Sequence, residues 1–409
     1  MIPLEDARTR VLEACARVGS VELPLARALG HVTTATVSSG EAIPPFDNTA
    51  MDGFAVRASD TADAPVRLEV VASLAAGTAT DRVLGPGEAM RIMTGAPMPP
   101  GADAVVMVER TRAVRGGVDG GDEGDGGEVV EVEVAVESGN HVRRAGDDVR
   151  PGDEVLAAGT TLTAGHLGVL ASLGLETVEV VRRPVVGVFS TGDELVEGGG
   201  PLEPGQIRDS NRLTLLALVE ESGFEGVDLG LVRDDEDAIA DAVRDGVSRC
   251  DAVLTSGGVS MGDYDYVKVV LDRLGDMDWM QVAIKPAKPF AFGVVDGVPV
   301  FGLPGNPVSS MVSFELFARP ALRRMAGHSD LDRPRVRGVA DEDLRRRADG
   351  KIHFLRVATR YEHGAYRARP AGGQGSHQLT AMAAADALAV LPDGDGTAAG
   401  DEVDLLLLR

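Results

Sequence analysis

The segment DAVLTSGGVSMGDYDYVKVVLDRLG, residues 251–275, decides the fold. Its apolar first half is typical of a short buried strand, and the glycine pair Gly257-Gly258 indicates a turn. Apolar residues at helical spacing follow in YDYVKVVLDRLG, residues 264–275. A strand that passes through a glycine turn into a helix is one unit of an α/β sheet, so we expect similar units on either side.

Strand and helix patterns do alternate on both sides of this segment. Short apolar strands are expected within residues 184–191, 226–234 and at the start of 299–322, and helices within 211–223, 236–250 and the end of 299–322. This alternation predicts a doubly wound, mostly parallel sheet. In such sheets, ligands bind at the carboxyl ends of the strands.

The full chain of 409 residues is too long for one hydrophobic core and divides into four regions. Residues 183–326 form the predicted doubly wound domain. Residues 1–24 with 139–182 are predicted to form an elongated N-terminal region, and residues 25–138 an inserted β-rich domain in which the acidic, glycine-rich residues 115–127 are a solvated hairpin tip. Residues 327–409 are predicted to form a small C-terminal β barrel. The fold class is therefore multidomain α/β.

The composition excludes several classes of protein. The net charge of −24 repels nucleic acid and anionic membranes, and no apolar run is long enough to span a bilayer. With no signal-peptide core, a cytoplasmic location is expected, and Cys15 and Cys250 fit buried thiols better than a disulfide. The acidic surface, with arginine far more frequent than lysine, suggests adaptation to high salt, although GC-rich codon usage would give the same bias.

Polar residues gather at the predicted strand ends of residues 183–326. Glycine-rich turns that lead into helices present backbone N–H groups to an oxyanion, and nearby carboxylates suit a divalent cation, most simply Mg²⁺ bridging phosphates. Each motif alone also fits a turn or a helix cap, so their common edge carries the hypothesis. The residues at these strand ends are Glu194, Asp234, Ser256, Gly257, Gly258, Ser260, Asp265, Gly305, Asn306 and Ser309.

Other motifs narrow the choice of chemistry. The chain contains neither the phosphate-binding motif GxxxxGK[ST] nor the dinucleotide-binding motif GxGxxG, so it is a weaker candidate for a nucleotide hydrolase or a dinucleotide-binding enzyme. Its seven histidines lack the spacing of metal ligands. A second polar set, Asp52, Thr94 and Asp148, lies far from the sheet in sequence. It fits ordinary turns equally well; alternatively it belongs to a different site, or to one shared across a dimer.

Eight ordered motifs then resemble one known family. PPFDNTAMDGFAVR, RIMTGAPMPPGADAVVMVE, VRRAGDDV, VGVFSTGDELV, GQIRDSNRLTL, TSGGVSMGDYDYVK, IKPAKPFAFG and GLPGNPVSSMVSF together are similar to the MoeA family of molybdopterin molybdenumtransferases, which is related to the E domain of gephyrin. The resemblance extends from the first helix to the last strand. It implies Mg²⁺-dependent insertion of molybdate into adenylylated molybdopterin, release of AMP, and a homodimer whose active site is shared between subunits.

The resemblance also implies roles for individual residues. Glu194, Asp234 and Asp265 would be metal-binding and catalytic acids, with Asp52, Thr94 and Asp148 supplied by the partner subunit. Lys285 and Lys288 would face the anionic ligand beside Ser256, Gly257, Gly258, Ser260 and the turn from Gly305 through Asn306 to Ser309. Arg356 and Ser376 would contribute from the last domain. The substrate brings its own dithiolene sulfurs, which agrees with only two cysteines.

Four positions depart from the family pattern: Phe54 replaces a usual tyrosine, Ala287 a frequent glycine, Gln281 a lysine of some relatives, and Arg208 a tyrosine. The Gln281 change puts one anion contact in doubt, for which Arg208 would compensate. Two alternative functions stay open, a molybdopterin adenylyltransferase and a non-catalytic cofactor carrier or scaffold. Molybdate and tungstate are not distinguished by the sequence.

The lysines carry one further argument. Only Lys268, Lys285, Lys288 and Lys351 occur among 40 basic residues, and two of them lie three positions apart in IKPAKP. At most positions of this chain arginine supplies the positive charge, so the two neighbouring lysines indicate positions that require a compact ammonium group. An ammonium group can approach a small oxyanion as a point charge. The adjacent prolines restrict the backbone and so help to fix both side chains.

Overall fold

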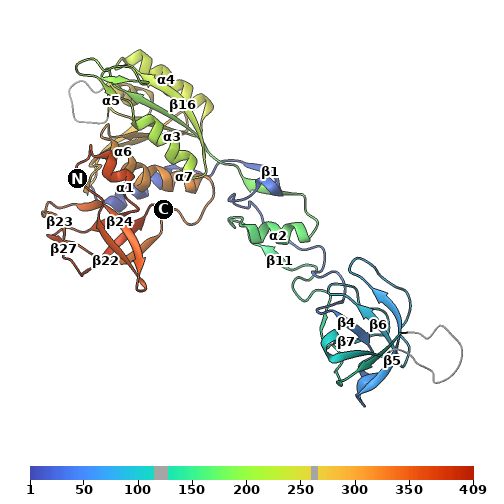
Figure 1. Cartoon of the computed structure of the whole chain (residues 1–409). Helices are drawn as coiled ribbons and strands as arrows, with labels where there is room; N and C mark the ends of the chain where they lie inside the picture. Colours follow the sequence, from blue (N-terminus) through green and yellow to red (C-terminus); the bar gives the residue numbers. More distant parts are fainter. Residues whose placement is uncertain (115–127, 259–265) are drawn as a thin grey trace, which may run out of the picture.

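The computed structural model describes residues 1–114, 128–258 and 266–409. Figure 1 shows an elongated molecule, in which a thin stalk separates a distal β domain from a larger body that contains both chain termini. The predicted hairpin tip at 115–127, and Ser260 and Asp265 among the predicted site residues, lie outside the described residues. No helix in the described part of the chain has the length and apolar character needed to span a bilayer.

The central domain is built on a six-stranded sheet of order β16-β13-β17-β21-β20-β18. The first four strands are parallel, β20 runs antiparallel to them, and β18 pairs antiparallel with β20, which confirms the predicted mostly parallel sheet. The strands are β13 (Val185–Thr191), β16 (Glu225–Val232), β17 (Ala252–Ser256), β18 (Asp276–Gln281), β20 (Pro289–Val295) and β21 (Val298–Leu303), with the small pair β14 (Leu195–Val196) and β15 (Ile207–Arg208) beside them.

Helices cover both faces of this sheet because the strands are apolar on both sides. On one face Phe189, Val253 and Val300 pack with the apolar sides of α4 (Glu236–Arg249) and α5 (Tyr266–Leu274). On the other, Val188 and Leu254 pack with α3 (Asn211–Glu221), α6 (Pro307–Ser313), the π-turn η4 (Phe314–Ala318) and α7 (Arg319–Met325). Two-sided burial is expected for parallel strands in a doubly wound fold.

The N-terminal helix α1 (Leu4–Ala14) also packs into this second face. Its residues Leu4, Ala7 and Val11 share a core with the central strands, although the sequence analysis grouped residues 1–24 with the stalk. Cys15 lies in the same core, and burial raises the pKa of its thiol to about 12. Cys15 and Cys250 are both buried free thiols, which confirms that prediction.

The stalk and the distal domain are almost entirely β-structure. The stalk pairs β1 (Ser20–Pro24) with β12 (Thr177–Val181), β2 (Val37–Ser38) with β11 (Glu154–Leu156), and β3 (Asn48–Thr49) with β10 (Val142–Arg143), and holds η1 (Leu25–Arg27) and α2 (Ala164–Ser172). The distal sheet has the order β7-β4-β6-β5-β9-β8. Its elements are β4 (Gly53–Val56), η2 (Ala58–Thr61), β5 (Val66–Leu74), β6 (Glu88–Ile92), β7 (Ala104–Met107), η3 (Val108–Arg110), β8 (Thr111–Val114) and β9 (Val129–Val132).

The C-terminal domain is a closed five-stranded barrel, as predicted. Strands β24 (Ile352–Glu362), β25 (Ala365–Pro370), β22 (Arg335–Ala340), β28 (Glu402–Leu407) and β26 (Ala387–Leu391) pair in that order, and β26 pairs again with β24. The strand β19 (Ile284–Lys285) of the central domain joins the edge of β24. The pair β23 (Leu344–Arg345) and β27 (Gly396–Thr397) and the short helix α8 (Leu379–Ala383) complete the domain.

A histidine marks the junction between stalk and central domain and leads to a pH prediction. Thr161 Oγ1 lies 3.1 Å from His328 Nδ1, and burial followed by the charges of Arg323 and Arg319 lowers the His328 pKa to about 4. An unfolded histidine takes up a proton near pH 6.5, so this contribution to stability is complete above that pH and is lost as the pH falls towards 4. We expect His328→Asn to lose less unfolding free energy than wild type between pH 6.5 and 4, measured by urea titration. Parallel curves would contradict the assignment.

Candidate active site

The carboxyl ends of the four parallel strands lie level with one another at one edge of the central sheet. The register aligns Thr191 with Val232, Ser190 with Ser256, and Ser256 with Leu303. The loops that follow these strands therefore start side by side. The structure thus confirms the main expectation from the sequence, that polar residues separated by more than a hundred positions converge on one edge.

Two of these loops bring carboxylates together. The backbone N–H of Asp193 donates to Asp234 Oδ2 at 3.4 Å, and the N–H of Asp234 donates to Asp193 Oδ1 at 3.3 Å. Burial raises the pKa of Asp234, and the charges of Asp193 and Glu194 add to this rise, while the Asp193 N–H opposes it. The structure therefore concentrates negative charge around Asp234, which a cation would relieve.

The neighbouring Asp235 has a different role. Its side chain accepts from the N–H of Ala238 at 2.9 Å and caps the N-terminus of α4. The sequence motif Asp234-Asp235 was consistent with capping by either residue. The structure separates the two: Asp235 stabilises the helix, and Asp234 faces the other acids.

A divalent metal fits this acidic corner only with help from a substrate. Among the described residues, no group of three or more His, Cys, Asp or Glu side chains could hold a metal ion. Mg²⁺, however, commonly uses one or two carboxylates together with water and substrate phosphates. Asp234 and Glu194 suit that pattern, and the crowded charge around Asp234 supports it.

The turn after β17 needs glycine for a steric reason. Gly257 has a φ of +103°, and a Cβ at this position would lie 2.7 Å from the carbonyl oxygen of Thr191. Its N–H donates to Leu303 O at 3.1 Å. Because Gly305 lies next to Gly257, with 3.7 Å between the Gly257 Cα and an ideal Gly305 Cβ, the loops after β17 and β21 are in contact. A side chain at Gly257 would separate strand ends that the site requires together.

Asn211 joins the same two loops, and sequence reasoning missed it. Its Nδ2 donates to Ser256 Oγ at 2.8 Å and to Gly305 O at 2.7 Å. The residue is the first of α3 and lies inside the family-like motif GQIRDSNRLTL, which was the available signal. Asn306 lies in the adjoining turn, directly before Pro307 at the start of α6, and the buried Ser309 lies in the first turn of that helix.

The barrel domain reaches this edge through the loop that contains Ser376. The carbonyl of Ser376 accepts from the N–H of Val308 at 3.1 Å. Arg356 is 1% exposed, and its guanidinium donates to the carbonyls of Gly373 at 2.9 Å and Gly375 at 3.1 Å. Arg356 therefore fixes the loop on which Ser376 lies, and burial lowers its pKa.

Lys285 lies at the mouth of a cationic cavity between the two domains. A cavity of about 200 Å³ is lined by Lys285, Arg356 and the arginines of residues 345–347. Lys285 and Lys288 are both exposed, and among the described residues neither makes an ion pair. Between them, Ala287 has a φ of +73°, a left-handed conformation that glycine adopts more readily than alanine.

The sequence did not predict the roles that the structure shows for Arg208 and for the arginines of the cavity. Arg208 donates to the carbonyl of Gly200 at 2.7 Å and so holds the neighbouring loop. Arg345, Arg346 and Arg347 lie in the run RRR, which could have been noticed as a cation cluster in an acidic chain.

The second predicted set lies elsewhere in the chain. Asp52 accepts from the N–H of Thr94 at 2.6 Å and from its hydroxyl at 2.8 Å, and these bonds lower the Asp52 pKa. Asp148 is exposed, and its N–H donates to Ile43 O at 3.0 Å. In Figure 1, the distal sheet with β4 and β7 lies at the far end of the stalk from α3 and α6, so a single chain does not bring Asp52 and Thr94, which flank strands of that sheet, to the central sheet.

Comparison with known proteins agrees with this architecture in every part of the chain. Residues 2–174 match the model described as the MoeA N-terminal region (domain I and II), and residues 187–324 match a probable molybdopterin binding domain. Residues 338–408 match the MoeA C-terminal region (domain IV). The fold and the site therefore define a multidomain protein built around a molybdopterin-binding domain.

Full-length relatives identify the family. The chain is 38% identical over 405 residues to the molybdopterin molybdenumtransferase of Haemophilus influenzae, covering 98% of this chain and 97% of that protein. It is 34% identical over 414 residues to the one from Bacillus subtilis, covering 100% and 94%. A crystal structure of a molybdopterin biosynthesis MoeA protein from Pyrococcus horikoshii OT3 matches with a TM-score of 0.82 and 30% identity, over 100% of both chains. The protein belongs to the MoeA family.

Proposed function

We propose that this protein is the transferase that inserts molybdenum into molybdopterin during molybdenum cofactor biosynthesis, as its full-length relatives are named to do. The finer proposal is that adenylylated molybdopterin and molybdate are the substrates, that AMP is released, and that Mg²⁺ is required. The observation that carries it is the carboxylate pair Asp193 and Asp234 at the strand ends that also hold the glycine turn at Gly257.

Each part of the site has a task in this reaction. Asp234 and Glu194, with the acid predicted at Asp265, would hold Mg²⁺, which neutralises charge on the phosphoanhydride and acts as a Lewis acid. The turn at Gly257 keeps backbone close to the strand ends, so that N–H groups can face an anion without steric obstruction by a side chain. Lys285 supplies positive charge to the oxyanion, and the loop held by Arg356 closes the cavity.

A homodimer with a shared site is supported by the position of the second set. Asp52 and Thr94 form a fixed pair on an exposed surface of the distal domain, and one chain leaves them far from the central sheet. A second copy arranged so that its distal domain meets this edge would complete the site with Asp52, Thr94 and Asp148. The cytoplasm is the proposed location, and tungstate is the alternative oxyanion.

Reconstitution with purified components tests the proposal. Protein, adenylylated molybdopterin and molybdate should release AMP in a Mg²⁺-dependent manner, with tungstate assayed in parallel, and chelation with EDTA should stop the release. No release with either oxyanion would contradict the proposed reaction. Accumulation of adenylylated pterin from molybdopterin and MgATP would instead support an adenylyltransferase, and cofactor binding without turnover would support a carrier.

A further inference from the structure

One wall of the Lys285 cavity is a loop of the barrel domain, residues 345–351, which begins at the last residue of β23 and leads to β24. The loop carries four basic side chains, Arg345, Arg346, Arg347 and Lys351, in a chain whose net charge is −24. Its three arginines all line the cavity with Lys285. Positive charge is thus concentrated at one position of an otherwise acidic protein, which attracts anions to this position.

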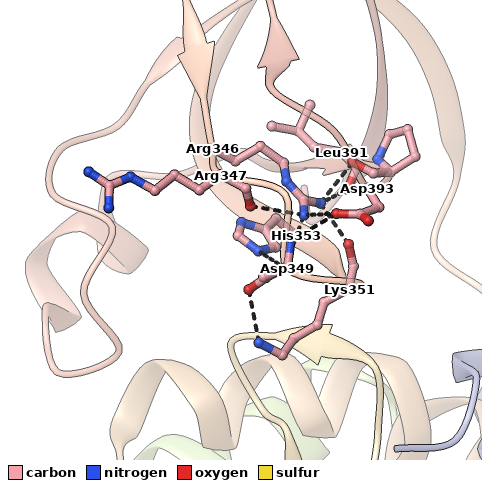
Figure 2. A network of polar contacts seen from close by, with 8 residues as sticks. Arg346, Arg347, Asp349, Lys351, His353, Leu391 and Asp393 are labelled. Carbon is pink, nitrogen blue, oxygen red and sulfur yellow. Dashed lines mark hydrogen bonds and ion pairs between the residues drawn. The ribbon is translucent and has the colours of Figure 1, made fainter.

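Arg346 anchors the loop from inside. Its side chain is fully buried, and both terminal nitrogens donate to several acceptors, as Figure 2 shows. A buried guanidinium with this many partners holds the surrounding backbone in one conformation. The acceptors are the carbonyls of Lys351 (2.6 Å), Leu391 (3.2 Å), Pro392 (2.8 Å) and Arg347 (3.2 Å) and the carboxylates of Asp349 (3.0 Å) and Asp393 (2.6 Å).

Asp349 uses its charge within the same network. It accepts from Lys351 Nζ at 2.8 Å and from His353 Nε2 at 3.1 Å, in addition to Arg346. The Lys351 bond, with the His353 bond and charge, lowers the Asp349 pKa to about 2. The Asp349 carboxylate therefore makes its hydrogen bonds within the network around Arg346.

Arg347 differs from its neighbours because its guanidinium points away from this network in Figure 2. Its backbone carbonyl is held by Arg346, so the side chain projects from a fixed position. Within the described ranges, no ion pair and no side-chain hydrogen bond engages its guanidinium, whereas Arg345 pairs with Asp343 at 2.8 Å. Arg347 therefore lines the cavity and carries a positive charge that no described side chain neutralises.

We propose that Arg347 is an oxyanion-binding residue of the Lys285 cavity and that Arg346 is the positioning residue that holds it there. This inference rests on the proposed function, because it assigns a binding residue to that reaction. The ligand class is a tetrahedral oxyanion that carries at least one full negative charge, and it has two possible sources: free molybdate, or a phosphate group of the pterin substrate. A guanidinium presents forked donors that match two oxygens of either.

Steady-state kinetics with Arg347→Gln and the matched control Arg345→Gln test the assignment. Both variants remove one cavity arginine, but Arg345 is already paired with Asp343. We expect Arg347→Gln to raise the KM of the bound oxyanion about tenfold with little change in kcat, and to weaken the dependence of kcat/KM on salt. Arg345→Gln, whose charge is already paired with Asp343, should change both far less than Arg347→Gln does, and Arg347→Lys should recover part of the affinity.

The outcomes separate the possibilities. A higher KM for molybdate assigns the residue to the free oxyanion, and a higher KM for the pterin assigns it to a substrate phosphate. If wild type is active and Arg347→Gln behaves as Arg345→Gln does, the inference is wrong. Inactive wild-type protein would instead overturn the proposed function.

A double-mutant cycle tests the positioning role of the anchor. Asp393→Asn weakens one acceptor of Arg346 without touching the cavity. If the anchor acts through Arg347, Asp393→Asn should raise the same KM in the wild-type background and have no further effect in the Arg347→Gln background. Equal effects in both backgrounds would show that Asp393 acts independently of Arg347, and the positioning role would be rejected.

Discussion

Asp234→Asn is expected to reduce AMP release by about a hundredfold or more while leaving the protein folded, since mutations around metal centres typically cost 10- to 100-fold and this residue is proposed to contact the metal directly. The amide keeps an oxygen that can accept from the Asp193 N–H, so the loop geometry is preserved. Only the charge is lost. The measurement is single-turnover AMP release with saturating Mg²⁺, together with the free energy of unfolding.

The stability measurement separates function from folding. The Asp234 pKa is raised by burial and by Asp193 and Glu194, so the native state disfavours this carboxylate. Removal of its charge should leave the unfolding free energy unchanged or higher near neutral pH. Loss of activity together with loss of stability would indicate a structural role and contradict the metal-site assignment.

Asp235→Asn provides the matched control. It removes the same charge from the adjacent residue, and asparagine caps helices about as well as aspartate. Because Asp235 caps α4 rather than facing the acids, activity should be retained. If Asp235→Asn impaired AMP release as strongly as Asp234→Asn, the effect would reflect general acidity of the loop.

The sequence predicted the central fold well because each signal there was local. A buried strand was predicted before the glycine pair Gly257-Gly258, and β17 ends at Ser256, directly before that pair. The alternation of strands and helices gave the correct parallel core. The antiparallel strands β18 and β20 were not identified, because their order in the sheet depends on pairing rather than on local pattern.

The site was predictable to the extent that it depends on strand ends. The edge with Asp234, Gly257 and Gly305 follows from topology alone. The hydrogen bonds of Asn211 and the different roles of Asp234 and Asp235 could not be predicted, because neighbouring polar residues look equivalent in a sequence. The same holds for Arg345 and Arg347, which differ only through the Asp343 pairing.

The packing of α1 shows a further limit of sequence reasoning. The buried residues Leu4, Ala7 and Val11 recur at helical spacing, but this spacing contains no information about which core receives them. The neighbouring strand β1 pairs with β12 in the stalk, while α1 packs against the central domain. Burial of an apolar face can be predicted from periodicity, whereas its partner is selected by the tertiary fold.

Lys285→Arg is the second change with a large expected effect. It conserves the positive charge and so tests only the shape of the cationic group. Lys285 ends β19, whose pairing with β24 fixes its backbone, and it lines a cavity of about 200 Å³ together with four arginines. A wider planar group should displace the bound oxyanion, and a misplacement of about 1 Å can cost roughly a hundredfold in rate. We therefore expect kcat/KM for molybdate to fall by about that factor.

Lys351→Arg is the control for this substitution. Lys351 lies in the barrel domain, directly before β24, and pairs with Asp349, a contact that arginine can also make. It should keep nearly full activity, so that the two variants differ only in whether the ammonium faces the cavity. Wild-type turnover by Lys285→Arg would mean that the two closely spaced lysines reflect chance in a lysine-poor chain. A large loss in that variant alone would explain why lysine persists where arginine has replaced it almost everywhere else.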